Sequence, residues 1–126
     1  MKQKKTNAMR ILDRQAIAYS VNTYDISTQH MDGEHVAEKV GVDPNHVYKT
    51  LVLENAAHEH FVFIIPVNKT LDMKAAAHSV AEKKLNLMPL DHLKKVTGYI
   101  RGGCSPIGMK RQFPTVIDQN AESLDS

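Results

Sequence analysis

The chain of 126 residues contains one cysteine and no tryptophan. A single thiol, Cys104, excludes an intrachain disulfide framework and a multi-thiolate metal site, and it favours a reducing compartment such as the cytoplasm. No apolar run approaches the roughly 18 residues that a membrane-spanning helix needs; the longest, 61–67, is short and contains Pro66. The basic amino terminus leads into a mixed segment instead of an apolar core, so no secretory signal is predicted.

The sequence also lacks internal repeats, low-complexity stretches and runs of glycine, proline and serine that would mark a linker. Its length fits one domain of ordinary size. A composition of 42% hydrophobic and 24% charged residues is typical of a globular chain, because disordered chains have fewer aliphatic residues and more net charge. We therefore predict a single folded domain over residues 1–126.

The formal net charge of +2 is too small to indicate a general nucleic-acid binder. The charges are unevenly distributed, however: residues 13–59 carry eight acidic and three basic side chains. Between residues 83 and 111 only Asp91 is acidic. A chain polarised in this way can present one basic face to a polyanion, although solvated lysines on surface helices would give the same pattern. The basic residues of this segment are Lys83, Lys84, Lys94, Lys95, Arg101, Lys110 and Arg111.

Helix signals come from caps and apolar spacing. Thr6 or Asn7 is expected to cap a first helix, Gly41 to end a second short helix over 35–40, and Thr70 or Asp72 to open a third. A fourth helix is predicted from Leu90 to a stop at Gly98, by the same signals.

Strand signals fall between these helices. We predict strands over 19–24, 47–53, 60–67, 84–88 and 115–118, with the second and third of them forming a hairpin across the polar turn 55–59. The strand 60–67 is apolar on both faces and should be central in the sheet. Strands and short helices that alternate without regular βαβ spacing favour an α+β domain with a mixed sheet.

Lys49 is the most informative single residue. Strand alternation groups it with Leu51 and Leu53 on the apolar face. A desolvated ammonium needs a partner, so Lys49 is either directed at an anionic or carbonyl-bearing ligand or extends its charge to water at a strand end.

The segment 102–108 has three glycines and Pro106, and Ser105 offers a hydroxyl. Glycines allow backbone amides to approach a ligand closely. The segment matches neither a P-loop nor a dinucleotide-binding fingerprint, and a plain tight turn is the alternative.

Metal and nucleophile signals are weak. His58 and His60 are the closest of seven histidines, but no HExxH motif or distant ligand set accompanies them, so surface histidines are expected. Cys104 could act as a nucleophile with a histidine from elsewhere in the fold, yet no cysteine-protease signature surrounds it, and a small filler in a glycine loop is the alternative.

Three segments taken together resemble one known family: Gly-Val-Asp-Pro at 41–44, Val-Tyr-Lys-Thr-Leu-Val at 47–52, and Thr-Gly-Tyr-Ile-Arg-Gly-Gly-Cys-Ser-Pro-Ile-Gly at 97–108. They resemble the YbaK/EbsC family of trans-editing aminoacyl-tRNA deacylases, which are related to the editing domain of bacterial prolyl-tRNA synthetases. The likeness covers nearly the whole chain and is greatest for the Cys-tRNA(Pro) deacylases. For the fold, it implies a mostly antiparallel sheet curled toward a barrel and flanked by short helices.

The resemblance implies a pocket around the aminoacyl ester with Lys49 as its catalytic residue. The cysteinyl substrate would supply its own thiol, so that neither a protein nucleophile nor a cofactor nor a metal is required. Mischarged tRNA(Pro) is the implied substrate and prolyl-tRNA synthetase a possible partner, with no role for a membrane or DNA. The basic segment 83–111 would contact the tRNA. The implied substrate-binding residues are Tyr24, His30, Met31, Thr50, Gly102, Gly103 and Ser105.

Two features depart from the family pattern. Cys104 stands where relatives have an aliphatic residue, which weakens a nucleophile role. Family members also continue beyond the position of Ser126 with a further strand, so the chain is expected to lack that carboxy-terminal segment. Two alternatives stay open: editing of another small amino acid such as alanine on tRNA(Pro), and a noncatalytic tRNA-binding module.

Overall fold

A β-hairpin forms the centre of the structure, a computed structural model that describes residues 5–21, 37–38, 41–99, 105–110 and 112–124. Its strands are β1 (Tyr48–Glu54) and β2 (His60–Pro66), paired antiparallel with Leu51 opposite Phe63. The turn between them is held by Asn55, whose side-chain oxygen accepts hydrogen bonds from the amides of Ala57 and Glu59 at 3.0 and 2.9 Å. The predicted hairpin is confirmed.

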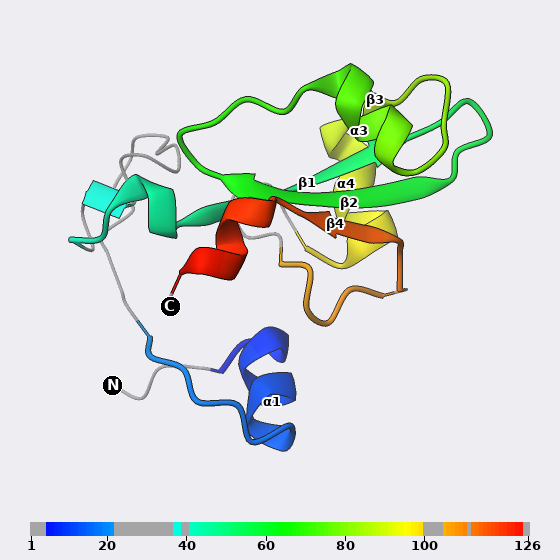
Figure 1. Cartoon of the computed structure of the whole chain (residues 1–126). Coiled ribbons are helices and arrows are strands. Elements are labelled where there is room, and N and C mark those ends of the chain that lie inside the picture. Colours follow the sequence, from blue (N-terminus) through cyan, green and yellow to red (C-terminus); the bar gives the residue numbers. More distant parts are fainter. Residues whose placement is uncertain (1–4, 22–36, 39–40, 100–104, 111, 125–126) are drawn as a thin grey trace.

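Two short strands complete a four-stranded sheet in the order β3-β1-β2-β4 (Figure 1). β3 (Asn86–Leu87) pairs antiparallel with β1, and β4 (Thr115–Ile117) pairs parallel with β2. The sheet is therefore mixed and mostly antiparallel, and β2 is central, as predicted. Over the described residues the sheet is open, with β3 and β4 at its edges, so the expected curl toward a barrel does not close it.

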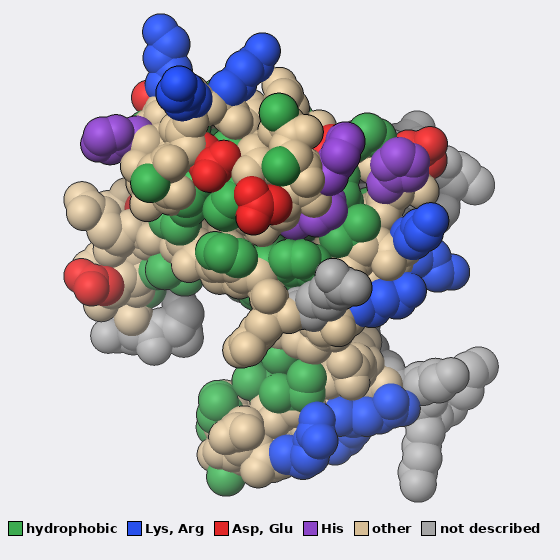
Figure 2. Space-filling view, turned by 90° about the vertical axis from the view of Figure 1, so that its right-hand side faces the viewer, with side chains coloured by type: hydrophobic (Ala, Val, Ile, Leu, Met, Phe, Trp, Pro, Cys, Tyr) green, Lys and Arg blue, Asp and Glu red, His purple; other side chains and the backbone are tan. Residues whose placement is uncertain are grey.

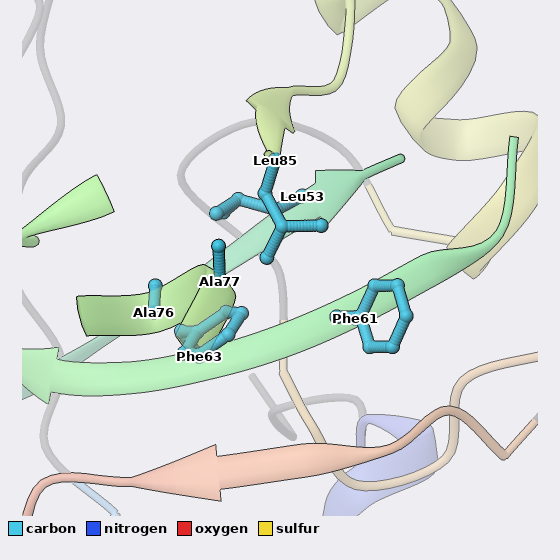
Figure 3. Packing of buried hydrophobic residues seen from close by; sticks show 6 residues of the cluster. All are labelled: Leu53, Phe61, Phe63, Ala76, Ala77 and Leu85. Atoms are coloured by element: carbon cyan, nitrogen blue, oxygen red, sulfur yellow. The ribbon is translucent and has the colours of Figure 1, made fainter. Parts of the chain in front are cut away.

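The first face of the sheet is covered by α3 (Met73–Ser79). Its core contains Leu53, Phe61 and Phe63 from the hairpin, which pack against Ala76, Ala77 and Leu85 (Figure 3). Strand alternation puts these three hairpin residues on one side. The small alanines of α3 let the helix approach the two phenylalanine rings closely.

The second face is covered by α4 (Leu90–Thr97). Here Val52 and Val62 pack with Met88 and Leu93. The partly buried side chains of Met109 and Phe113 pack against the same cluster. Burial on both faces explains why β2 reads as an almost continuous apolar run.

The helix ends follow the predicted signals. α1 (Asn7–Arg14) begins at Thr6, which forms a capping box with Met9. Asp72 caps α3 through the amides of Lys74 and Ala75, and Gly98 ends α4 with a left-handed φ of 86°. Two short 3-10 helices, Pro44–His46 and Gln119–Ser123, begin at Asp43 and Asp118.

The strand predicted over 19–24 is wrong for the part that the structure describes. Residues 19–21 have no strand partner, and the Tyr19 hydroxyl instead donates a hydrogen bond to Asp13 at 3.0 Å. Ile17 and Val21 remain 52% and 44% exposed, so no sheet face among the described residues buries this segment. Residues 22–24 lie outside the described residues, as does most of the helix predicted over 35–40, of which 37–38 are helical.

None of the helices in the described ranges is long and apolar enough to cross a membrane.

Candidate active site and RNA-binding surface

Lys49 lies near the start of β1, directly opposite Ile65 of β2. It shares the first face of the sheet with Leu51 and Leu53, and its side chain is half-buried. No carboxylate of the described residues lies within 4.0 Å of its ammonium group. A cation is thus held at the end of an apolar face without a described counter-charge.

Thr50, the next residue of β1, lies opposite Ile64 and points to the second face. That face also carries Met109, so the 105–110 segment packs on the side of Thr50. In the described structure Lys49 and Thr50 are therefore back to back across the strand. Because the two side chains point to opposite faces, a ligand that contacts both would have to reach around the start of β1.

The described part of the glycine-rich segment is anchored to the end of α4. Tyr99 donates its hydroxyl proton to the carbonyl of Ile107 at 2.6 Å, and the Lys110 amide donates to the carbonyl of Thr97 at 3.0 Å. Thr97 itself is fully buried, and its hydroxyl accepts from the Tyr99 amide at 3.0 Å. These supporting roles of the Thr-Gly-Tyr motif cannot be predicted from sequence, because they depend on the position of α4 beside the 105–110 segment.

Ser105 takes part in this scaffold. Its Oγ accepts a hydrogen bond from the Ile107 amide at 3.1 Å, which closes a tight turn around Pro106. Ser105 therefore fixes the shape of the segment whether or not it also contacts a ligand.

Gly108 makes the contact between this segment and α1. Its φ is +82°, and its carbonyl accepts a hydrogen bond from the Asn7 side-chain amide at 3.0 Å. A Cβ at this position would lie 2.5 Å from the Asn7 amide nitrogen and 2.9 Å from the Ile11 methyl group. Glycine is required here for close packing against α1, a role that was not predicted for the segment.

A cavity of about 780 Å³ lies next to this contact. Ile11 of α1 forms one wall, and the other is formed by Pro106, Ile107, Gly108, Met109, Gln112, Phe113 and Thr115. Figure 1 shows α1 set apart below the sheet. The two walls of the cavity come from parts of the chain that are far apart in sequence.

The predicted tRNA-binding lysines are all exposed and fall into two groups. Lys94, Lys95 and Lys110 meet at the end of α4, where the Lys110 ammonium approaches the Lys95 carbonyl at 3.4 Å. Lys83 and Lys84 belong to the turn before β3, beside Asn55 and Glu82. Figure 2 shows lysine and arginine side chains gathered in separate places on one side of the molecule.

The pair His58 and His60 has a structural partner. Both rings face the carboxylate of Glu54, at 3.6 and 3.5 Å, and the His60 ring also meets Phe113 edge-on at 5.7 Å between centroids. In the described part of the chain no three His, Cys, Asp or Glu side chains gather as metal ligands would. His58 is on the surface, as expected, whereas the His60 side chain is only 16% exposed.

Several predicted site residues lie outside the described residues. They are Tyr24, His30, Met31, Arg101, Gly102, Gly103, Cys104 and Arg111.

Comparison with known proteins identifies the family. Residues 28–125 match the family model described as the aminoacyl-tRNA editing domain. The chain is 42% identical over 124 residues to an Enterococcus faecalis protein named "Putative Cys-tRNA(Pro)/Cys-tRNA(Cys) deacylase EbsC", an alignment that covers 98% of this chain and 76% of that protein.

Solved structures share the fold. One, titled as a "putative trans-editing enzyme for prolyl tRNA synthetase", superposes with a TM-score of 0.77 at 21% identity and covers 94% of this chain and 76% of its own. The crystal structure of a hypothetical protein superposes equally well, at 18% identity over 91% of this chain and 75% of its own. The expected α+β editing-domain fold is confirmed. The chain therefore belongs to the aminoacyl-tRNA editing domain family, and its activity is aminoacyl-tRNA deacylation.

Proposed function

We propose that this protein is a trans-editing enzyme that removes cysteine from mischarged Cys-tRNA(Pro) in the cytoplasm. The observation that carries the proposal is the half-buried Lys49, a cation on an apolar sheet face with no carboxylate of the described residues within reach. A protein that only bound RNA would have no need of a lysine in that position. The choice of cysteine rests on the 42% identical relative that is named as a Cys-tRNA deacylase.

The proposed reaction uses the thiol of the substrate. The cysteinyl sulfur attacks its own ester carbonyl, the new C–S bond forms a strained thiolactone, and the C–O bond to the tRNA ribose breaks. The thiol proton leaves with the tRNA hydroxyl, and water then opens the thiolactone to free cysteine. The enzyme lowers the barrier by holding thiol and carbonyl in attacking geometry and by stabilising the negative charge on the carbonyl oxygen.

Each site residue has a role in this proposal. The Lys49 ammonium orients the ester or stabilises the developing oxyanion. Thr50 and Ser105 supply hydroxyl groups from the strand and the turn. The amides of Gly102 and Gly103 approach the ester and the terminal adenosine. The family resemblance assigns Tyr24, His30 and Met31 to another wall of the pocket, which would set the size of the amino acid that fits.

The test compares two substrates under single-turnover conditions. We expect the ester of Cys-tRNA(Pro) to be lost at least about tenfold faster than that of Ala-tRNA(Pro), because alanine has no thiol to attack its carbonyl. Faster loss from Ala-tRNA(Pro) would favour an alanine-editing enzyme. Binding of both tRNAs without loss of either ester would show a noncatalytic RNA-binding module.

A second prediction concerns the basic residues at the end of α4. Reversing two charges with Lys94→Glu and Lys95→Glu should weaken tRNA binding and flatten its dependence on salt, by roughly one counterion for each lost phosphate contact. The matched control reverses two exposed lysines near α3, Lys69→Glu and Lys74→Glu. Equal affinity and equal salt slope in both double variants would remove Lys94 and Lys95 from the tRNA-binding surface.

A further inference from the structure

The cavity between α1 and the chain from Pro106 to Thr115 has the composition of a nucleotide site. Its volume of about 780 Å³ falls in the range of small-molecule sites, roughly 300–1,000 Å³. Phe113 offers an aromatic face and Ile11 an apolar one, while Gln112 offers an amide that can donate and accept hydrogen bonds. A base needs both an apolar surface to stack on and polar groups at its edge.

Two arginines of α1 flank the cavity-lining Ile11 on the helix. Asn7, which bonds to Gly108, and Ile11, which lines the cavity, are four residues apart on one helix face. Arg14 is three residues after Ile11, so it continues the same stripe. Arg10 lies one turn before Arg14 on the helix. Both arginines are exposed, and no carboxylate of the described residues lies within 4.0 Å of either.

The acid of this helix does not offset their charge. Asp13 lies three residues after Arg10 on α1, and Lys5 forms an ion pair with it at 2.5 Å. The hydrogen bond from Lys5 is the main reason that the pKa of Asp13 is below its ordinary value. Because the charges of Asp13 and Lys5 offset each other, Arg10 and Arg14 leave a net positive charge on this helix.

A cation also lies next to the other wall in the sequence. Lys110 directly follows the cavity-lining Met109, and its ammonium reaches the carbonyl of Lys95 at the end of α4. Arg10 and Arg14 thus flank the cavity-lining Ile11 on α1, and Lys110 adjoins Met109 in the sequence with its ammonium at the end of α4. This arrangement is complementary to a ligand with an aromatic ring and phosphate groups.

We propose that this cavity binds an unpaired nucleotide at the acceptor end of the tRNA, with its base against Phe113 and its phosphates on Arg10 and Arg14. The inference rests on the proposed function, since it names a second RNA contact of that substrate. It adds a helix that lies outside the matched part of the family model, which begins at residue 28. An apolar peptide fits the cavity less well, because it offers no partner for the arginines.

The first experiment measures the binding of uncharged tRNA(Pro) to the full chain across a series of salt concentrations. Arg10→Ala with Arg14→Ala should weaken binding several-fold and lower the salt slope by roughly 0.7 for each lost contact to single-stranded phosphate. Lys69→Ala with Lys74→Ala removes the same charge elsewhere and should leave both values near wild type. Equal losses in the two double variants would overturn the proposal in favour of general charge attraction.

The second experiment tests the base contact. Phe113→Leu keeps an apolar side chain but removes the ring, and it should weaken binding of intact tRNA about tenfold. It should not change the binding of the same tRNA without its unpaired 3′ nucleotides. Because Phe113 also contacts the second core cluster, Gln112→Ala, at an exposed position of the same wall, provides an independent variant with the same expected dependence on those nucleotides.

The outcomes separate this inference from the proposed function. If the Phe113 and Gln112 variants bind intact and shortened tRNA with wild-type affinity while the wild-type protein deacylates Cys-tRNA(Pro), only the nucleotide site is overturned. If the variants lose binding to intact tRNA while the wild-type protein cleaves neither aminoacyl ester, the nucleotide site stands and the proposed function falls.

Discussion

Lys49→Ala is expected to lower the single-turnover rate of Cys-tRNA(Pro) deacylation about a hundredfold, because removing an ordered donor to a developing oxyanion typically costs that much. The structure gives Lys49 no evident structural role, since its ammonium has no acidic partner within the described residues and its neighbours on the sheet face are apolar. The rate and the tRNA affinity are measured separately, since a role in charge stabilisation lowers the rate more than the binding.

Stability distinguishes a functional lysine from a structural one. Lys49→Met replaces the charge with an apolar side chain of similar length, and we expect the free energy of unfolding to stay within about 0.5 kcal/mol of wild type or to rise. A loss of turnover without a loss of stability is the signature of a residue retained for activity. Wild-type turnover in both Lys49 variants would show that the lysine only extends its charge to water at the strand end.

Much of the fold could be predicted because its signals are local. The caps at Thr6, Asp72 and Gly98 each act within one helical turn, and all three lie at helix ends in the structure. The hairpin followed from two apolar runs joined by a short polar turn. Alternation also predicted that Lys49 shares a face with Leu51 and Leu53, which the register with β2 confirms.

The rest of the fold depends on contacts between distant residues. Nothing near Val116 indicates that β4 pairs parallel with β2 and not antiparallel. The segment around Tyr19 has the composition of a strand, but it has no sheet edge beside it in the described structure and bonds to Asp13 instead. A tertiary context of this kind overrides local preference.

The candidate site shows the same division. Composition indicated a basic segment but could not show where its lysines lie. Lys83 and Lys84 belong to the turn before β3, whereas Lys94, Lys95 and Lys110 lie at the end of α4. Composition also could not show that α1 packs against the 105–110 segment, because Asn7 and Gly108 are 101 positions apart in the sequence. The roles of Tyr24, His30, Met31, Gly102 and Gly103 remain predictions from family resemblance.

Gly108→Ala is expected to lower the free energy of unfolding by about 3 kcal/mol and to displace α1 from the 105–110 segment. A left-handed φ costs a non-glycine residue about 1–2 kcal/mol, and forcing a methyl group into occupied space adds about 1–3 kcal/mol. The occupied space is explicit here: the new Cβ would lie within 3.0 Å of both the Asn7 amide nitrogen and the Ile11 methyl group, and 3.1 Å from the Tyr99 hydroxyl oxygen.

Gly41→Ala provides the control that separates the two costs, because Gly41 has a similar φ of +73° but no atom of the described residues lies within 4 Å of an added Cβ. It should show the backbone cost alone, about 1–2 kcal/mol. Denaturant unfolding of both variants measures the difference in stability, which we assign to the contact with α1.

If that contact also shapes the nucleotide cavity, Gly108→Ala should weaken binding of intact tRNA at temperatures where the protein remains folded, whereas Gly41→Ala should not. Equal destabilisation in the two variants, with equal RNA affinity, would mean that α1 moves aside at no cost and that neither stability nor binding depends on its position.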